Sequence, residues 1–137
     1  METRTIGAAE VAEKIEAENA KLSERLAAGI PALIRLVKVA LSDTGQSQVC
    51  GRFLLGLYNG PCYRFDLTDL RRLDTELFDD CMSVLRMDAN PVREVHNLIE
   101  DGDVVFRRLR MYWATEDEAS DWPQDELNEW SQHHVGH

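Results

Sequence analysis

Four histidines are the side chains whose chemistry depends most on their surroundings. His96 stands beside Glu94 and Asn97 in a helical segment, where an imidazole can act as a general base. A histidine at the edge of a core, with one ring nitrogen in water, explains the same position, and we adopt that interpretation. The other three form an HHxxH pattern that suits a divalent metal: His133, His134 and His137. Because this pattern lies at a terminus where helices fray, we predict neither a metal site nor a cofactor.

Carboxylates and thiols offer the other routes to catalysis. A cluster of four acids is typical of paired catalytic carboxylates or of a metal site: Asp74, Glu76, Asp79 and Asp80. An exposed helix face that also carries Arg71 and Arg72 explains this cluster without chemistry. The three cysteines are odd in number and form no CxxC, so they are predicted to be reduced and mostly core thiols: Cys50, Cys62 and Cys81. No GxGxxG, GxxxxGK[ST], HExxH or GxSxG motif occurs, so we predict no enzyme and no catalytic residue.

Direct binding to nucleic acid is also not expected. Residues 70–87 and 91–99 have the outline of a helix-turn-helix, but the second segment offers Arg93 as its only cation and ends in Glu100 and Asp101. A phosphate backbone repels such a helix end. The densest cations are expected to pair with carboxylates around the last core helix: Arg107, Arg108 and Arg110.

Hydrophobic spacing is helical along most of the 137 residues and predicts an all-α protein. We expect a compact bundle of five to six helices with an acidic C-terminal tail. Gly29 is expected to end the first helix and Pro31 to open the second. The expected helices cover residues 8–28, 31–42, 49–58, 66–87, 91–99 and 103–113.

Single residues set the later helix boundaries. Asp66 or Thr68 is expected to cap the helix that ends near residue 87, and Asp103 to cap the last one. Asn90 followed by Pro91 predicts a short helix over 91–99. Two glycines within the 49–58 helix predict that another helix approaches it closely: Gly51 and Gly56.

The formal charge of −10 is strongly local. Residues 116–137 contain seven acids and no Lys or Arg, so they contribute −7. One interpretation is a solubilising, partly disordered tail that packs one tryptophan back on the core. The other is a partner-binding segment, since a purely solvating tail has little use for two tryptophans. The sequence therefore divides into an amphipathic helix (1–29), a helical core (30–115) and an acidic tail (116–137). The expected partner-binding residues are Glu116, Asp117, Glu118, Asp121, Trp122, Asp125, Glu126, Glu129 and Trp130.

A family resemblance covers somewhat less than half of the chain. The run GRFLLGLYNGPCYRFDLTDLRRLDTELFDDCMSVLRMD, followed by NPVREVH, resembles a small family of proteobacterial proteins of unknown function found in phages, plasmids and integrated elements. The resemblance implies an all-α accessory protein of a mobile element. It implies no reaction and no functional residue.

Together these features favour a protein that binds another protein. Carboxylates of the tail would steer towards a basic surface, with Trp122 or Trp130 as an anchor. The specific hypothesis is an anti-defence factor, such as an anti-CRISPR or anti-restriction inhibitor, acting on a nucleic-acid-binding defence complex. The alternative is a structural or regulatory protein that forms a homodimer through residues 1–29. Without a signal peptide or an 18-residue apolar run, the chain is expected to be cytoplasmic and not to bind membranes.

Overall fold

The computed structural model describes residues 5 and 7–134, and helices dominate it. Within that part of the chain no strand is present, so the predicted all-α class is confirmed. In chain order the elements are α1 (Ala8–Ala40), α2 (Ser47–Tyr58), the 3-10 helix η1 (Leu67–Arg72), α3 (Thr75–Ala89), the 3-10 helix η2 (Val95–Asn97), α4 (Gly102–Trp113), α5 (Glu116–Ala119) and α6 (Gln124–His134).

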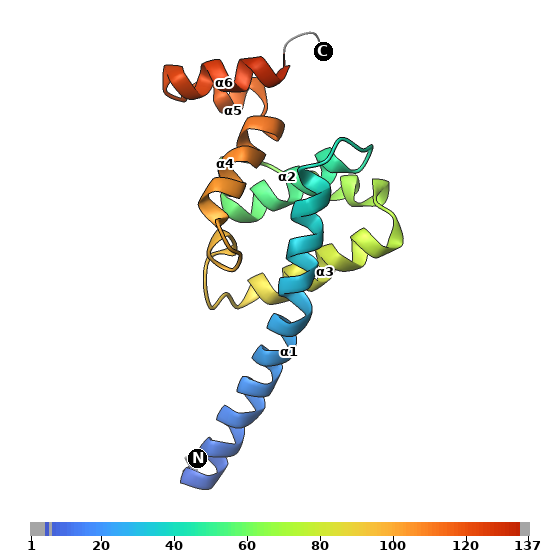
Figure 1. The fold of residues 1–137 in the computed structure, drawn as a ribbon. Helices are drawn as coiled ribbons and strands as arrows, with labels where there is room; N and C mark the ends of the chain where they lie inside the picture. Colours follow the sequence, from blue (N-terminus) through green and yellow to red (C-terminus); the bar gives the residue numbers. More distant parts are fainter. Residues whose placement is uncertain (1–4, 6, 135–137) are drawn as a thin grey trace.

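The helices are arranged around the C-terminal half of α1. This half packs against α3 and α2. In turn, α2 packs against α4, and α4 packs against α6. The N-terminal half of α1 projects from the body at one end of the molecule, and α5 and α6 lie at the opposite end (Figure 1). No helix among the described residues is both long enough and apolar enough to span a bilayer.

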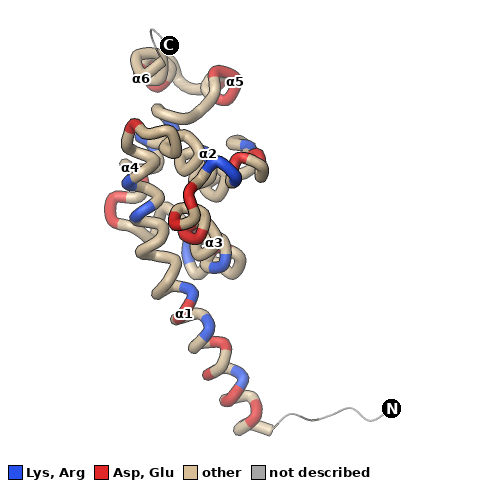
Figure 2. The backbone as a smooth tube through the Cα atoms, turned by 90° about the vertical axis from the view of Figure 1, so that its right-hand side faces the viewer, with Lys and Arg blue, Asp and Glu red and all other residues tan. Residues whose placement is uncertain are grey.

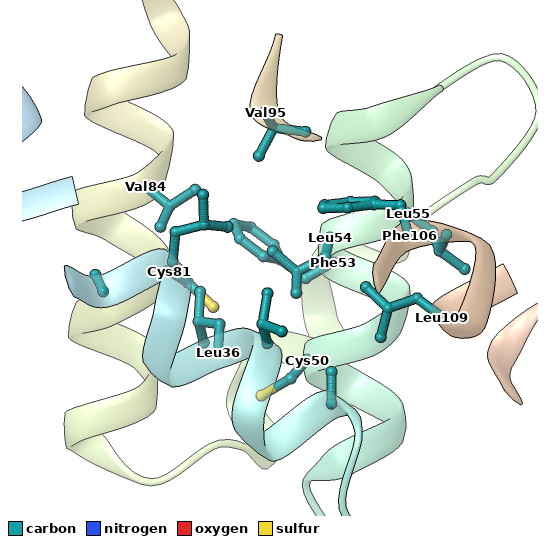
Figure 3. Packing of buried hydrophobic residues seen from close by; sticks show 14 of the residues in the cluster. Leu36, Cys50, Phe53, Leu54, Leu55, Cys81, Val84, Val95, Phe106 and Leu109 are labelled. Carbon is teal, nitrogen blue, oxygen red and sulfur yellow. The ribbon is translucent and has the colours of Figure 1, made fainter. Parts of the chain in front are cut away.

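A single apolar core joins α1, α2, α3 and α4. Leu36 of α1, Phe53 of α2 and Val84 of α3 lie side by side in it, and Phe106 and Leu109 of α4 close it (Figure 3). The largest side chains are fully withdrawn from water, which makes this cluster the main source of stability.

The predicted break at Gly29 and Pro31 is wrong, because α1 runs through both residues. Gly29 is buried against α3, where a Cβ atom would lie 2.5 Å from Sδ of Met87. The residue is therefore a close-contact position within the helix rather than its end. Pro31 is exposed, so the ring faces solvent and costs the helix one backbone hydrogen bond. Burial of Leu33 and Leu36 immediately beyond it offsets that loss.

The single helix predicted for residues 66–87 is divided into two. Asp66 accepts a hydrogen bond from Thr68 N (3.0 Å) and caps only the short η1. Leu73 is extended, and Asp74 then caps α3 by accepting from Leu77 N (2.8 Å). Two capping aspartates eight residues apart thus begin two helices where the hydrophobic spacing indicated one.

The predicted helix over 91–99 is also wrong. Within this segment the structure contains only the 3-10 turn η2, held to the core by the buried Val95. The cap of α4 differs as well: Asp101 is the N-cap residue, with a positive φ of 55° and no side-chain cap, and Asp103 lies inside the first turn. The next residue is Gly102, where a side chain has no room because the carbonyl of His96 occupies the position that its Cβ atom would take. The second helix of the helix-turn-helix outline is therefore not formed.

Candidate functional site

The acidic tail forms two helices that pack back on the body. Thr115 begins α5 with a capping box, in which its Oγ1 accepts from Glu118 N (3.2 Å) while a Glu118 oxygen accepts from Thr115 N (2.9 Å). The carbonyl of Pro123 accepts from Leu127 N (2.9 Å) at the start of α6. Pro123 therefore stands immediately before α6.

Arg52 of α2 fixes α5 to the body. Its guanidinium donates to both carboxylate oxygens of Glu118, at 2.5 and 2.9 Å, and both side chains are about one-seventh exposed or less (13% and 14%). It also donates to the carbonyls of Trp113 (3.2 Å) and Arg64 (2.6 Å). Burial raises the pKa of Glu118, but the hydrogen bonds from Arg52 and Thr115 outweigh it, and the net pKa is lowered.

Arg110 and Arg107 of α4 hold α6 in the same way. Arg110 donates to Glu126 (3.0 Å) and to the hydroxyl of Tyr63 (3.0 Å), and its guanidinium lies 4.5 Å from the ring centre of Trp122. Arg107 forms an ion pair with Glu129 at 2.7 Å. Burial raises the pKa of Tyr63, and the Arg110 contact opposes part of that rise. Arg107 and Arg110 thus pair with carboxylates as predicted.

The two tail tryptophans are contacts within the chain. Trp130 donates from Nε1 to the carbonyl of Ala114 (2.9 Å) and stacks on His134 with ring centres 4.2 Å apart. Trp122 lies against Arg110, and both indoles are half-buried against the core cluster. Their presence in the tail is explained by docking of α5 and α6.

The nine predicted site residues therefore fall into two groups. Five fold the tail: Glu118, Trp122, Glu126, Glu129 and Trp130. Four acids remain exposed and have no basic partner among the described residues, and they gather around α5 and the turn that leads into α6: Glu116, Asp117, Asp121 and Asp125. Figure 2 shows the acidic colour on α5 at this end of the molecule. We call these four residues the acidic corner.

The histidines of the tail take part in a cavity that the sequence did not indicate. His133 packs edge-on against Tyr112, and a ring nitrogen of His134 lies 3.2 Å from the carbonyl of Met111. Both line a cavity of about 540 Å³ together with the end of α1 and the last turn of α4. The spacing of HHxxH carried no signal for it, because the other walls are distant in sequence. His137 lies outside the described residues.

The remaining candidate groups occupy structural positions. His96 is at the core edge, as predicted, with Nε2 3.7 Å from an Asp103 oxygen and a buried Nδ1 that lacks a hydrogen-bond partner. Asp80 corrects the prediction of a solvated acidic face, because it is buried and receives two hydrogen bonds from Arg35 (2.8 and 3.0 Å).

Two of the three thiols are in the core, as predicted. Burial raises the pKa of Cys50 to about 11 and that of Cys81 to about 12, whereas Cys62 is exposed. Such buried thiols are poor nucleophiles at neutral pH, because the reactive thiolate is scarce.

Comparison with known proteins relates the chain to a protein family. A model described as a family of unknown function matches residues 30–114, from the C-terminal part of α1 to the residue after α4. The acidic corner, α6 and the projecting half of α1 lie outside that match. No curated protein and no solved structure matches the chain.

Proposed function

The chain belongs to this family of unknown function, DUF7673, so we propose a function from the features of its surface. We propose that the protein binds a protein partner, without catalysis, through the α5–α6 end. The observation that carries this proposal is the acidic corner, in which four exposed carboxylates lie within ten residues and have no basic partner in the part of the chain that the structure describes. Since α5 and α6 are held by three arginines, the corner is presented on a fixed surface. A basic partner surface would meet it with little loss of conformational entropy.

The charge density of this surface favours steering over imitation of DNA. All seven tail acids on one continuous helix would give one carboxylate per roughly 5 Å, against one charge per about 1.7 Å of duplex axis. Three of the seven are neutralised by arginines within the chain. The exposed acids are therefore sparser still, and they suit a protein that approaches a basic surface and blocks it sterically.

The nature of the partner is proposed from the resemblance to mobile-element proteins. An accessory protein of such an element would gain from binding a host nucleic-acid-binding complex, whose basic groove is the complementary surface. The proposed biological role is therefore inhibition of a host defence complex, such as a CRISPR or restriction system.

A charge-neutral variant tests the proposal. The full-length protein and Glu116→Gln/Asp117→Asn/Asp121→Asn/Asp125→Asn are used as bait in a proteobacterial lysate, with Glu13→Gln/Glu16→Gln/Asp69→Asn/Asp79→Asn as the matched control. We expect nucleic-acid-binding proteins to be captured by the wild type and the control, and to be lost with the corner variant and at raised salt. Equal capture by the corner variant would refute the proposal.

A second candidate function is homodimerisation, and the projecting half of α1 favours it. Val11 and Ile15 lie on one side of this segment and are 42% and 55% exposed. Light scattering of the full chain is expected to show a dimer that Val11→Glu/Ile15→Glu dissociates and that Ala20→Glu, on the opposite side of the helix, leaves intact. A monomer at all accessible concentrations would exclude this candidate.

A further inference from the structure

The cavity of about 540 Å³ beside α6 is built from three separate segments. Leu41, Ser42 and Asp43 follow the end of α1, and Tyr112 and Trp113 end α4. The last turn of α6 supplies His133 and His134. The volume lies within the range of cavities that hold small ligands or single side chains of a partner.

Aromatic rings form adjacent walls of this cavity. The planes of Tyr112 and Trp113 are 87° apart, with ring centres separated by 6.3 Å, and Tyr112 meets His133 at 66° and 5.0 Å. Trp113 is held in place because its Nε1 donates to the carbonyl of Ala40 (2.7 Å) and its ring lies against Gly51. Tyr112, Trp113 and His133 thus line one volume, and aromatic side chains grouped around one volume are how aromatic cages hold cations.

The charge around the cavity has the sign that attracts a cation. Among the described residues that line the cavity, the exposed Asp43 is the only carboxylate, and none is Lys or Arg. The cavity also adjoins the C-terminal end of α1, a helix of 33 residues, where the helix dipole is negative.

We propose that this cavity receives the guanidinium group of an arginine. A flat guanidinium stacks on aromatic rings and pairs through two parallel hydrogen bonds with a carboxylate, which a compact ammonium group does not do. A guanidinium already stacks on an indole at this end of the protein, where Arg110 lies over the ring of Trp122. The arginine would belong to the basic partner, and this part of the assignment rests on the proposed function.

Asp125 of the acidic corner is in the first turn of α6, and His133 and His134 of the cavity are in its last turn. A helix of this length places them roughly 15 Å apart along its axis, a distance that about five residues of extended chain span. A basic segment can therefore place one arginine in the cavity while its other charges face the corner.

The three indole N–H signals in an NMR spectrum test the cavity directly. The full-length protein is titrated with acetyl-arginine amide at about pH 8, where histidine side chains in general are uncharged. The Trp113 signal is expected to shift and saturate, while that of Trp122, already covered by Arg110, stays in place. Acetyl-citrulline amide, which has the same shape without the charge, should bind at least about fivefold more weakly. Equal shifts with citrulline, or tighter binding of acetyl-lysine amide, would overturn the guanidinium assignment.

Two variants test the carboxylate and the aromatic ring of the cavity separately. Asp43→Asn removes the carboxylate and Tyr112→Leu removes one ring, and each is expected to weaken arginine binding about three- to tenfold. Asp79→Asn is the matched control, because this exposed acid lies outside the cavity lining. Unchanged binding by both cavity variants, with unchanged thermal unfolding, would contradict the proposal.

An eight-residue peptide of alternating Arg and Gly distinguishes a partner's arginine from a free guanidino compound. We expect the peptide to bind more tightly than acetyl-arginine amide, and the gain to disappear in the acidic-corner variant. No gain from the peptide would overturn the assignment to a protein partner. If lysate capture is independent of the corner while Trp113 still responds to arginine, the proposed function fails and the cavity assignment stands.

Discussion

At the scale of single residues, Arg52 is the side chain on which the end of the molecule depends most. It joins α2 to Glu118, to the end of α4 and to the carbonyl of Arg64. We expect Arg52→Ala to lower the free energy of unfolding by about 3 kcal/mol, because it leaves a largely buried carboxylate without its partner. Arg52→Lys should recover only part of this loss, since an ammonium group cannot make the two parallel bonds. Urea denaturation measures both, and equal stability of the lysine variant and the wild type would contradict this account.

Glu118 makes the stability depend on pH in a defined direction. Its pKa in the folded protein is lower than the ordinary value of 4.5, so the folded state binds the proton less readily than the unfolded chain. The resulting stability is present above about pH 4.5 and is lost as the pH falls through the lowered pKa. Glu118→Gln should therefore show a flatter loss of stability in acid than the wild type, when urea midpoints are compared at neutral and acidic pH. Asp125→Asn, at an exposed unpaired acid, should retain the wild-type slope.

The thiols should differ in reactivity as they differ in burial. Native protein is expected to react rapidly with an aromatic disulfide reagent at Cys62 alone, and at Cys50 and Cys81 only after denaturation. Mass spectrometry of the labelled peptides checks the assignment. Rapid labelling of Cys81 in the native state would contradict its position in the core.

At the scale of elements, α2 and α4 meet at a glycine. A Cβ atom on Gly51 would overlap the Trp113 ring, whereas one on Gly56 would lie 3.3 Å from Cβ of Phe65. The predicted close approach of a helix is thus confirmed at Gly51, and at Gly56 the approaching segment is the loop before η1. We expect Gly51→Ala to destabilise the protein by about 2 kcal/mol and Gly56→Ala to be nearly neutral, since its gain in helix propensity offsets slight crowding. The unfolding temperatures of the two variants measure this difference, because both variants make the same substitution within α2.

The errors in the predicted elements share a physical cause. Gly29 and Pro31 are typical of a helix boundary, but packing of the flanking helix against α3 and α2 outweighs that local preference. Hydrophobic spacing continued through Leu70 and Leu73, and it gave no sign that the extended Leu73 divides the segment. The all-α class was predictable because it follows from the hydrophobic spacing. Partners distant in sequence, such as Arg35 for Asp80 and Arg52 for Glu118, were not.

At the scale of the whole molecule, the residues of the tail fall into two sets, one that attaches the tail to the body and one that gives its surface a negative charge. Its seven acids and two tryptophans stood out by composition. Three acids and both indoles attach the tail to arginines and carbonyls of the body. Only the other four acids provide net charge at the surface. The aromatic cavity lay beyond sequence reasoning, because three segments up to 93 residues apart, Leu41 to His134, build it.

At the opposite end of the molecule, the described residues belong to the half of α1 that projects from the body (Figure 1). Residues 11–21 of α1 are all exposed, with Lys21 and Glu18 forming an ion pair at 3.6 Å across one turn. A helix segment without tertiary contacts frays from its free end, because its hydrogen bonds open at little cost. We therefore expect limited trypsin digestion to cut first after Lys14 and Lys21, and to leave the rest of the chain intact. N-terminal sequencing of the product checks this, and a first cut after Arg71 or Arg72 in η1 would contradict it.

The same digestion, repeated at several protein concentrations, tests whether α1 forms a dimer. If two copies pair through Val11 and Ile15, the cuts after Lys14 and Lys21 should slow as concentration rises, since the paired helices open together. The Val11→Glu/Ile15→Glu variant should be cut at a rate that does not depend on concentration. A wild-type rate that is equally independent would exclude pairing through Val11 and Ile15.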